Sequence, residues 1–445
     1  MTYASNSSDS SRLSDYYLVL LAGVLMGYAI IGKGVAYLSF PPIYVGEIAL
    51  LTGAVIFLWS GCVVAALSTL PSILLAATMA WVLVRTLPFV GVYGVDALRD
   101  SVVILYGGFA FIVIGLLLGD SRRLNTILRW YRAFLNVFIP VIFFVVVFSR
   151  FMADYIPNLP GTKVPLPDVR CSEVAVHLTG AAVFVLVGFC KVSPLRIVLL
   201  VATVVIASVD SRGAMLAFVC PVMFAAFMLG KVRELATVLV AGLVIVSAAY
   251  TVETGFTFGH EESVLVERPI STRTLIDSVT SIFSGGDPES TKQWRLDWWD
   301  IIFKNTLYGP NFWTGRGFGL NLADADGFQR GDNPDIAPLR SPHSVHMTML
   351  ARAGVPGVTL WGAFLASWLG MVIHGMVTAW LRGQTEWACL FLFTSCYATS
   401  FIINASFDVA LEGPMQGVWF WCLIGFGIGS VMVYRCQPRQ VLRPP

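Results

Sequence analysis

Arg212 is the first side chain whose type and position suggest chemistry. It lies in the sequence DSRG, between two apolar runs that leave no room for a true loop. A guanidinium held there can bind an anionic headgroup such as a diphosphate through paired hydrogen bonds. The ordinary alternative is a side chain that extends along apolar surface to reach lipid headgroups. Both interpretations stay open for this residue alone.

Arg295 is the second such residue, and it lies in the tryptophan-rich segment QWRLDWW. A lone arginine on an exposed helix is most often a solvated charge, and Asp297, two residues away, would not face it. The tryptophans around it, Trp298 among them, suit packing against the rest of the protein, although one or two could stack on sugar rings. Arg316, in GRGFG, is a further candidate contact, and its ordinary interpretation is a surface arginine between glycines.

His343 is the third, and the sequence SPHSVHM around it holds two of the five histidines of the chain. A histidine at the start of a helix is usually structural, but a neutral imidazole can also take a proton near pH 7. Two arginines can neutralise a departing diphosphate without a metal, and a base can activate the attacking hydroxyl. Asp408, in NASFDVALEGP, also follows an apolar run and is a candidate for orienting a catalytic group.

The composition places these residues in a membrane protein. Of the 445 residues, 56% are hydrophobic and only 13% are charged, about half the charge of a soluble domain. The net charge of +2 gives no reason to expect nucleic acid as a partner. The eight cysteines show neither CxxC pairs nor the spacing of Cys/His ligands, so we expect no disulfide framework and no zinc site.

Twelve apolar stretches approach the length that crosses a bilayer core of about 30 Å. With the N-terminus inside, the inner connections hold 13 Lys and Arg residues and the short outer ones hold 7, which places both termini in the cytoplasm. We therefore predict an all-α polytopic membrane protein with about twelve transmembrane helices. The stretches lie at about 16–32, 44–67, 71–88, 100–119, 133–149, 172–190, 195–210, 213–230, 236–251, 356–378, 386–406 and 415–434.

The informative connection is a large outer loop between the ninth and tenth helices, which is too long to be a passive link. Within it, TKQWRLDWWDIIFKN at 291–305 repeats apolar residues at helical spacing and predicts an amphipathic helix. The predicted organisation is a disordered cytoplasmic tail over 1–15, helices one to nine over 16–251, the outer loop with short helices over 252–342, helices ten to twelve over 343–434, and a cytoplasmic tail over 435–445.

These motifs resemble those of the O-antigen ligase and O-antigen polymerase superfamily, which assembles bacterial cell-surface glycans. DSRGAMLAF is similar to the SRG motif of the family, and QWRLDWW followed by GRGFGLN is similar to its R-x-x-x-W … G-x-G-x-N stretch. PHSVHMTMLARAGVPG is similar to the signature in which H-N-x-x-L precedes G-x-x-G, with Ser344 and Met347 in the places of Asn and Leu. The similarity is specific over about 196–430 and rests mainly on topology before that.

The resemblance implies a glycosyltransferase of the bacterial inner membrane with its active site on the periplasmic side. Arg212 and Arg295 would hold the diphosphate of an undecaprenyl-linked glycan donor, and His343 would activate the acceptor hydroxyl of a glycan, lipid or protein. Arg316, Asp408 and Trp298 would be further contacts. No metal, nucleotide or other cofactor would be needed, and the partners would include the lipid bilayer and other polysaccharide-assembly proteins.

Three alternatives stay open at this level. A ligase and a polymerase use the same donor and leaving group, so the motifs do not separate them. A multi-span transporter or flippase of lipid-linked sugars would also suit twelve helices, but it predicts internal repeats and charges within the spans. The polar residues cluster instead near the predicted outer surface, which favours an enzyme. A structural protein of an assembly complex is the third alternative.

Overall fold

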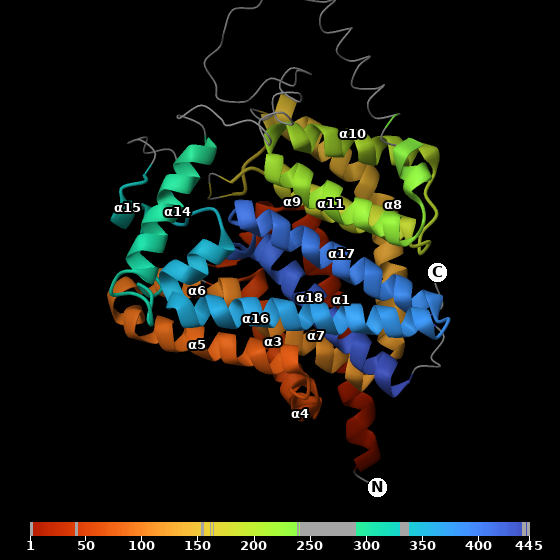
Figure 1. The fold of residues 1–445 in the computed structure, drawn as a ribbon. Coiled ribbons are helices and arrows are strands. Elements are labelled where there is room, and N and C mark those ends of the chain that lie inside the picture. Colours follow the sequence, from red (N-terminus) through yellow and green to blue (C-terminus); the bar gives the residue numbers. More distant parts are fainter. Residues whose placement is uncertain are drawn as a thin grey trace, which may run out of the picture.

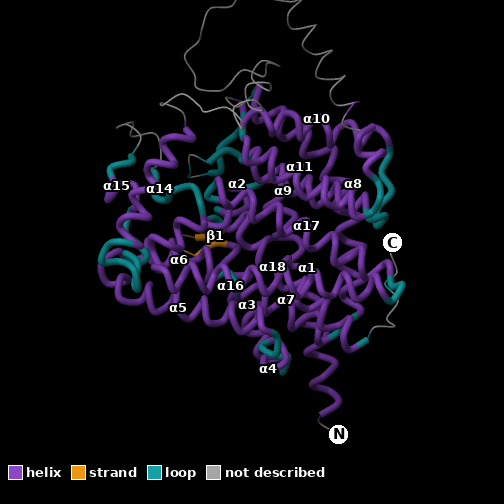
Figure 2. The backbone as a smooth tube through the Cα atoms, viewed as in Figure 1, coloured by secondary structure: helices purple, strands orange, loops and turns teal. Residues whose placement is uncertain are grey.

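The computed structural model describes residues 3–40, 43–152, 155–160, 162, 164–237, 240, 291–329, 338–437 and 442. Nearly all of these residues are helical (Figure 2), and the two short strands form one antiparallel pair in which Ser39 is opposite Tyr44. The elements are α1 (Tyr3–Ile31), α2 (Lys33–Ala36), β1 (Ser39–Phe40), β2 (Ile43–Tyr44), α3 (Val45–Trp59), α4 (Val63–Ala66), α5 (Leu70–Tyr93), α6 (Val95–Leu105), α7 (Gly108–Gly119), α8 (Arg122–Phe151), α9 (Cys171–Leu186), α10 (Pro194–Asp210), α11 (Arg212–Met228), α14 (Thr291–Leu307), α15 (Leu322–Asp326), α16 (Val345–Leu381), α17 (Thr385–Phe407), the 3₁₀ turn η2 (Ala410–Glu412) and α18 (Pro414–Cys436).

The structure confirms a polytopic helical membrane protein. Among the described residues, six helices are long and apolar enough to cross a membrane: those over Ser11–Ile31, Leu70–Tyr93, Arg122–Ser149, Val345–Leu381, Thr385–Phe407 and Pro414–Cys436. The pair α6 and α7 also passes this test, with a bend of 41° between its halves. Four shorter apolar helices, α3, α9, α10 and α11, accompany them.

Helices cover eleven of the twelve predicted stretches, and the other, 236–251, lies almost entirely outside the described residues. The total of twelve spans therefore stays a prediction. Three stretches differ in detail from what the apolar pattern suggested. The stretch 44–67 ends as a helix at Trp59, 100–119 is broken near Gly107, and α1 begins at Tyr3, inside the segment 1–15 that was predicted to be disordered. The apolar composition of a stretch does not show where its helix breaks, because the same apolar side chains suit a continuous helix and a broken one when their neighbours are lipid or protein.

The centre of the bundle lies around α17 and α18, whose apolar windows are 83% and 94% buried, while that of α5 is only 22% buried. Figure 1 shows α16, α17 and α18 running beside one another through the molecule, with α9, α10 and α11 along one side. The helix α18 approaches α7 closely because Gly425 and Gly429, four residues apart, face the backbone of Ala110 and Ile114. Small residues at this spacing let two helix backbones touch, which is the usual basis of helix association in membranes.

Several helix ends gather at the face that carries the predicted site residues. Lys33, just after α1, forms an ion pair with Asp168, and Ser172 at the start of α9 donates a hydrogen bond to Asp408 after α17. The starts of α11 and α16 lie at this face as well. In Figure 1, α14 and α15 form a cap over the same end of the bundle. The described parts of the predicted outer loop, 291–329 and 338–342, therefore stand over the site, and 252–290 and 330–337 lie outside the described residues.

Candidate active site

His343 lies beside Asp408. The distance from His343 Nδ1 to Asp408 Oδ1 is 3.7 Å, and both side chains are about one-quarter exposed. Among the described residues, the buried Nδ1 atom has no hydrogen-bond partner, and it faces the carboxylate at a distance slightly longer than a hydrogen bond. The backbone of His343 has φ 53°, a left-handed conformation that non-glycine residues seldom adopt and that recurs at functional sites.

Three other groups hold the carboxylate of Asp408. The hydroxyl of Ser172 donates to Oδ2 at 2.7 Å, the amide of Val409 donates to Oδ1 at 2.8 Å, and a guanidinium nitrogen of Arg170 lies 3.8 Å from Oδ1. Burial by itself would raise the pKa of Asp408, but His343, Ser172 and Arg170 together outweigh it and hold that pKa well below its usual range. Asp408 is therefore an anion at neutral pH, with one oxygen directed at His343.

Arg212 begins α11, directly after Ser211, whose side chain caps the helix by accepting from the amide of Ala214 at 3.2 Å. The neighbouring Gly213 packs against Phe407, because a Cβ atom there would lie 3.2 Å from the Phe407 Cβ. Phe407 directly precedes Asp408 in the chain. The start of α11 is thereby placed beside the turn that carries Asp408, and the partly buried Arg212 extends from it.

Arg295 lies in α14, the predicted amphipathic helix, which the structure confirms over Thr291–Leu307. The ring of the preceding residue, Trp294, stands 6.1 Å from the ring of His343 in an edge-to-face arrangement. The indole of Trp299 donates to the carbonyl of Pro342 at 2.9 Å, which ties α14 to the residue before the histidine. The elements that carry Arg212, Arg295, His343 and Asp408 thus converge on one region.

His346, the second histidine of the motif, has a structural role. Its Nδ1 accepts a hydrogen bond from the indole of Trp361 at 3.1 Å, so a neutral imidazole carries its proton on Nε2. That proton faces the hydroxyl of Ser406 at 3.1 Å, and the hydroxyl donates onward to a carbonyl of α17. Both ring nitrogens of His346 are hydrogen-bonded, and the bond to Ser406 joins α16 to α17. The ring of His343 has no such pair of hydrogen bonds among the described residues.

Arg316 and Trp298 are engaged within the cap. The guanidinium of Arg316 binds Asp326 through two hydrogen bonds of 2.6 and 2.9 Å, and the indole of Trp298 donates to the same carboxylate at 2.8 Å. Trp298 is completely buried and stacks on Phe328 at 5.3 Å between ring centres. In this conformation Trp298 presents no open face to a sugar, so its role here is in the small core of the cap.

The glycine motifs meet at a break in α16. Gly354 has φ 70° and ψ −172°, and Pro356 has no amide hydrogen to donate, so three carbonyls of the preceding turn need other partners. The amides of Arg316 and Gly317 donate to the carbonyls of Ala351 and Arg352 at 2.8 and 3.0 Å. The indole of Trp81 donates to the carbonyl of Ala353 at 2.9 Å. The GRGFG segment therefore supplies hydrogen bonds to carbonyl groups left unpaired by the break in α16, and it joins the cap to the bundle.

A network of buried charges holds the segment that leads to His343. The sequence analysis did not identify this network. Arg352, only 1% exposed, lies 3.0 Å from Asp100 of α6, and Arg340 also binds Asp100 at 3.0 Å and Asp96 at 3.1 Å. The amide of Gly319 donates to Asp100 as well. Arg340 precedes His343 by three residues, so the network fixes the segment leading to it. The sequence offered one sign of this network, which is a charged residue such as Arg352 within an apolar segment.

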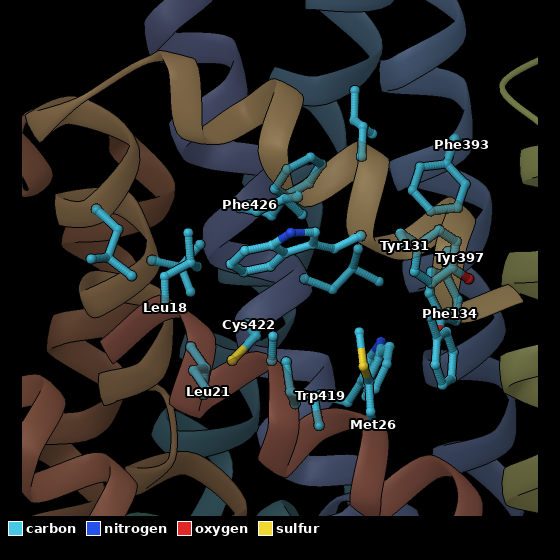
Figure 3. Close-up of a pocket in the computed structure, with 18 residues that line it drawn as sticks. Leu18, Leu21, Met26, Tyr131, Phe134, Phe393, Tyr397, Trp419, Cys422 and Phe426 are labelled. Atoms are coloured by element: carbon cyan, nitrogen blue, oxygen red, sulfur yellow. The ribbon is translucent and has the colours of Figure 1, made fainter. Parts of the chain in front are cut away.

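An apolar cavity of about 130 Å³ lies elsewhere, among α1, α7, α8, α17 and α18 (Figure 3). Its wall includes Leu18, Met26, Phe134, Trp419 and Phe426, and the polar atoms on it are few. Such a lining has nothing to bind a diphosphate or a sugar, because polar ligands need hydrogen-bond partners when they are buried. We therefore place the candidate active site at His343 and Asp408 and not in this cavity.

One comparison with known proteins matches the part of the chain that carries most of these residues. Residues 197–362 match a protein family described as O-antigen ligase. This segment contains Arg212, Arg295, Arg316 and His343, so the match agrees with the family resemblance of the motifs. The chain matches no curated protein sequence.

Proposed function

Because residues 197–362 match the O-antigen ligase family, we propose that this membrane protein belongs to that superfamily and transfers a glycan from an undecaprenyl-diphosphate carrier to an acceptor hydroxyl. The observation that carries the proposal is the pair formed by His343 and Asp408 at 3.7 Å, beside the starts of α11 and α14. An imidazole backed by a carboxylate is a general arrangement for taking a proton from a hydroxyl.

His343 acts as the general base in this proposal. Asp408 faces Nδ1, so the neutral ring keeps its proton there and leaves the lone pair of Nε2 for the acceptor hydroxyl. The distance of 3.7 Å exceeds that of a hydrogen bond, and such contacts often shorten when substrate binds. As the proton moves to Nε2, the imidazolium that forms is stabilised by the anionic carboxylate.

The transfer itself forms one bond and breaks one. The acceptor oxygen attacks the anomeric carbon of the donor sugar while its proton passes to His343. The bond from that carbon to the diphosphate oxygen breaks, and the diphosphate leaves with the electron pair. Arg212 and Arg295 bind the diphosphate and neutralise the charge that develops on it, which is the term that most lowers the barrier in such reactions.

Arg170 and Arg316 differ in what they offer this reaction. Arg170 is 42% exposed and already lies near Asp408, so it adds positive charge at the site. Arg316 is 12% exposed and its guanidinium is bound to Asp326, so we propose that it supports the cap, with substrate contact only if that pair opens. The modest excess of Lys and Arg in the predicted inner connections supports an inner-membrane location with the site on the periplasmic side.

The test is a gel of surface glycans and lipid-linked intermediates from cells that carry only the His343→Ala protein. We expect transfer to be lost while the protein still inserts into the membrane. The matched control is His374→Ala, because His374 lies on an exposed part of α16 far along the helix from the site. Normal transfer by the His343→Ala protein would refute the assignment of the base.

The same gel separates the two members of the superfamily. Acceptors that carry a single repeat unit would identify the wild-type protein as a polymerase. Bare acceptors together with long lipid-linked chains would identify it as a ligase. An unchanged pattern would refute the assignment of the base and would count against the enzyme interpretation as well.

A further inference from the structure

The loop over 308–314, which leads from α14 to the GRGFG segment, is held against two membrane-spanning helices. A guanidinium nitrogen of Arg85 in α5 donates to the carbonyl of Thr314 at 2.6 Å. The amide of Val355 in α16 donates to the carbonyl of Phe312 at 2.8 Å. Figure 1 shows α14 ending near α5 at the cap end of the bundle. The height of this loop relative to the bilayer is thereby tied to the height of the two helices.

These contacts lie beside a helix end and a helix break. Arg85 precedes Tyr93, the last residue of α5, by eight positions, which is about 12 Å along the axis at ~1.5 Å per residue. Val355 directly follows Gly354, where α16 is broken, so it begins the second part of that helix. This second part, 355–381, is about 40 Å long and exceeds a bilayer core of roughly 30 Å, so its first turns lie near the edge of that core. The loop therefore meets the bundle near the boundary of the hydrocarbon layer.

Two aromatic side chains of this loop point away from the protein. Tyr308 is 87% exposed and Trp313 is 70% exposed. Thr314, next to Trp313, is bonded to Arg85 of α5, and the neighbours of Arg85 on that helix are exposed as well, Leu87 at 64% and Val84 at 56%. Since α5 is a candidate membrane span with only 22% of its apolar window buried, most of its surface faces lipid. The loop is therefore continuous with a lipid-facing surface.

Tyrosine and tryptophan are the residues that membrane proteins place at the bilayer surface, because each has an apolar ring and a polar group that stays hydrated. Large exposed rings are unfavourable in water. We propose that the 308–314 loop is seated in the headgroup layer of the leaflet on the site side, with Tyr308 and Trp313 as its anchors to phospholipid. The bilayer is then a third support of the cap, in addition to α5 and α16.

The position of the 308–314 loop in the headgroup layer affects the placement of the candidate active site. The loop directly follows α14, and Arg295 lies on that helix about three turns before its last residue, Leu307. A loop that rests on the headgroups sets the depth of α14 relative to the lipid surface. A diphosphate on a lipid carrier lies at that depth too. The lipid contact itself does not depend on the proposed reaction.

The test is a depth measurement by electron paramagnetic resonance on the full chain in phospholipid nanodiscs. A nitroxide is attached to cysteine introduced by Tyr308→Cys or Trp313→Cys, and the matched control is Asp300→Cys, on the exposed side of α14. Reactive native cysteines are first replaced by serine, and those that are exposed or partly exposed are Cys62, Cys171, Cys220 and Cys436. Each label is then relaxed by molecular oxygen, which concentrates in lipid, and by a water-soluble nickel chelate.

We expect the ratio of relaxation by oxygen to relaxation by the nickel chelate to be clearly higher for the labels at 308 and 313 than for the label at 300. A label at 313 that behaves like the one at 300 would place the loop in water and overturn the proposal. Protection of both loop labels from both reagents would also overturn it, because the loop would then be covered by protein. Loss of transfer by the His343→Ala protein bears on the reaction alone, so the two proposals fail separately.

Discussion

Replacing Asp408 with asparagine tests the geometry most directly. The substitution keeps the shape of the side chain and removes the charge that lies 3.7 Å from Nδ1 of His343. The new amide can also donate to Nδ1, which would force the ring proton onto Nε2 and block the base. We therefore expect a slower transfer.

The separation of the two groups sets the size of the effect. Coulomb's law gives about 1 kcal/mol for unit charges at ~4 Å in water and about 4 kcal/mol at an effective dielectric constant of ~20. Because the side chains of His343 and Asp408 are 25% and 22% exposed, an intermediate value of about 2 kcal/mol applies. This corresponds to roughly a 30-fold loss of kcat/KM.

The direction of the effect follows from the charge. An anion beside the imidazole stabilises the imidazolium that forms as the acceptor hydroxyl loses its proton, so removal of the anion raises the barrier of the transfer step. The assay measures initial rates of glycan transfer by protein in nanodiscs, with a lipid-linked donor at varied concentration.

The control for this variant is Asp120→Asn. Asp120 also bonds an arginine, Arg122, but it lies before α8 at the opposite end of the bundle, so its loss should leave the rate unchanged. A rate loss in the Asp408→Asn protein that comes with a matching loss of thermal stability would mean that the carboxylate only supports the fold. An unchanged rate would refute the orientation of His343 by Asp408.

Three further predictions concern the arginines and the supports of the site. The Arg212→Lys protein should lose most of its transfer activity, on the order of 10²-fold in kcat/KM, because lysine cannot bind a diphosphate through two parallel hydrogen bonds, and rates at varied donor concentration check this. The Gly317→Ala protein should unfold at a lower temperature in detergent, because φ is 79° there and a Cβ atom would overlap a ring of α5, so an unchanged melting temperature would argue against this docking. The Asp100→Asn protein should lose about 3–5 kcal/mol of stability, because it leaves Arg352 buried with less compensation, and a denaturant titration that shows less than ~1 kcal/mol would contradict the network.

The sequence alone predicted the parts of the site that depend on residue type. Arg212 and His343 stood out because strongly polar groups are few in an apolar chain and these two lie where apolar runs end, whereas Arg295 stood out because tryptophans surround it. The amphipathic helix α14 followed from the spacing of its apolar residues, and the structure has it over Thr291–Leu307. Asp408 was a candidate for orienting a catalytic group, and its place beside His343 now supports that role.

Other features depended on contacts between segments far apart in the chain. Trp298 suited either stacking on a sugar or packing in a core, and only its complete burial beside Asp326 decides for packing. The residue types alone did not distinguish the two histidines of the motif. The hydrogen-bond partners of His346 in the structure identify it as the structural one. The link between Arg352 and Asp100 joins residues about 250 positions apart, and no local pattern specifies such a pair.

The amino-acid sequence by itself determined the membrane environment, most of the helices and the residue types available for chemistry, because these follow from local composition and spacing. The tertiary structure decided which helix ends meet, that the glycine motifs close a broken helix, and that one histidine is left beside a carboxylate. The physical reason is that a hydrogen bond or ion pair depends on distances of a few ångströms between atoms. Those distances are set by the packing of whole helices and not by the order of neighbouring residues.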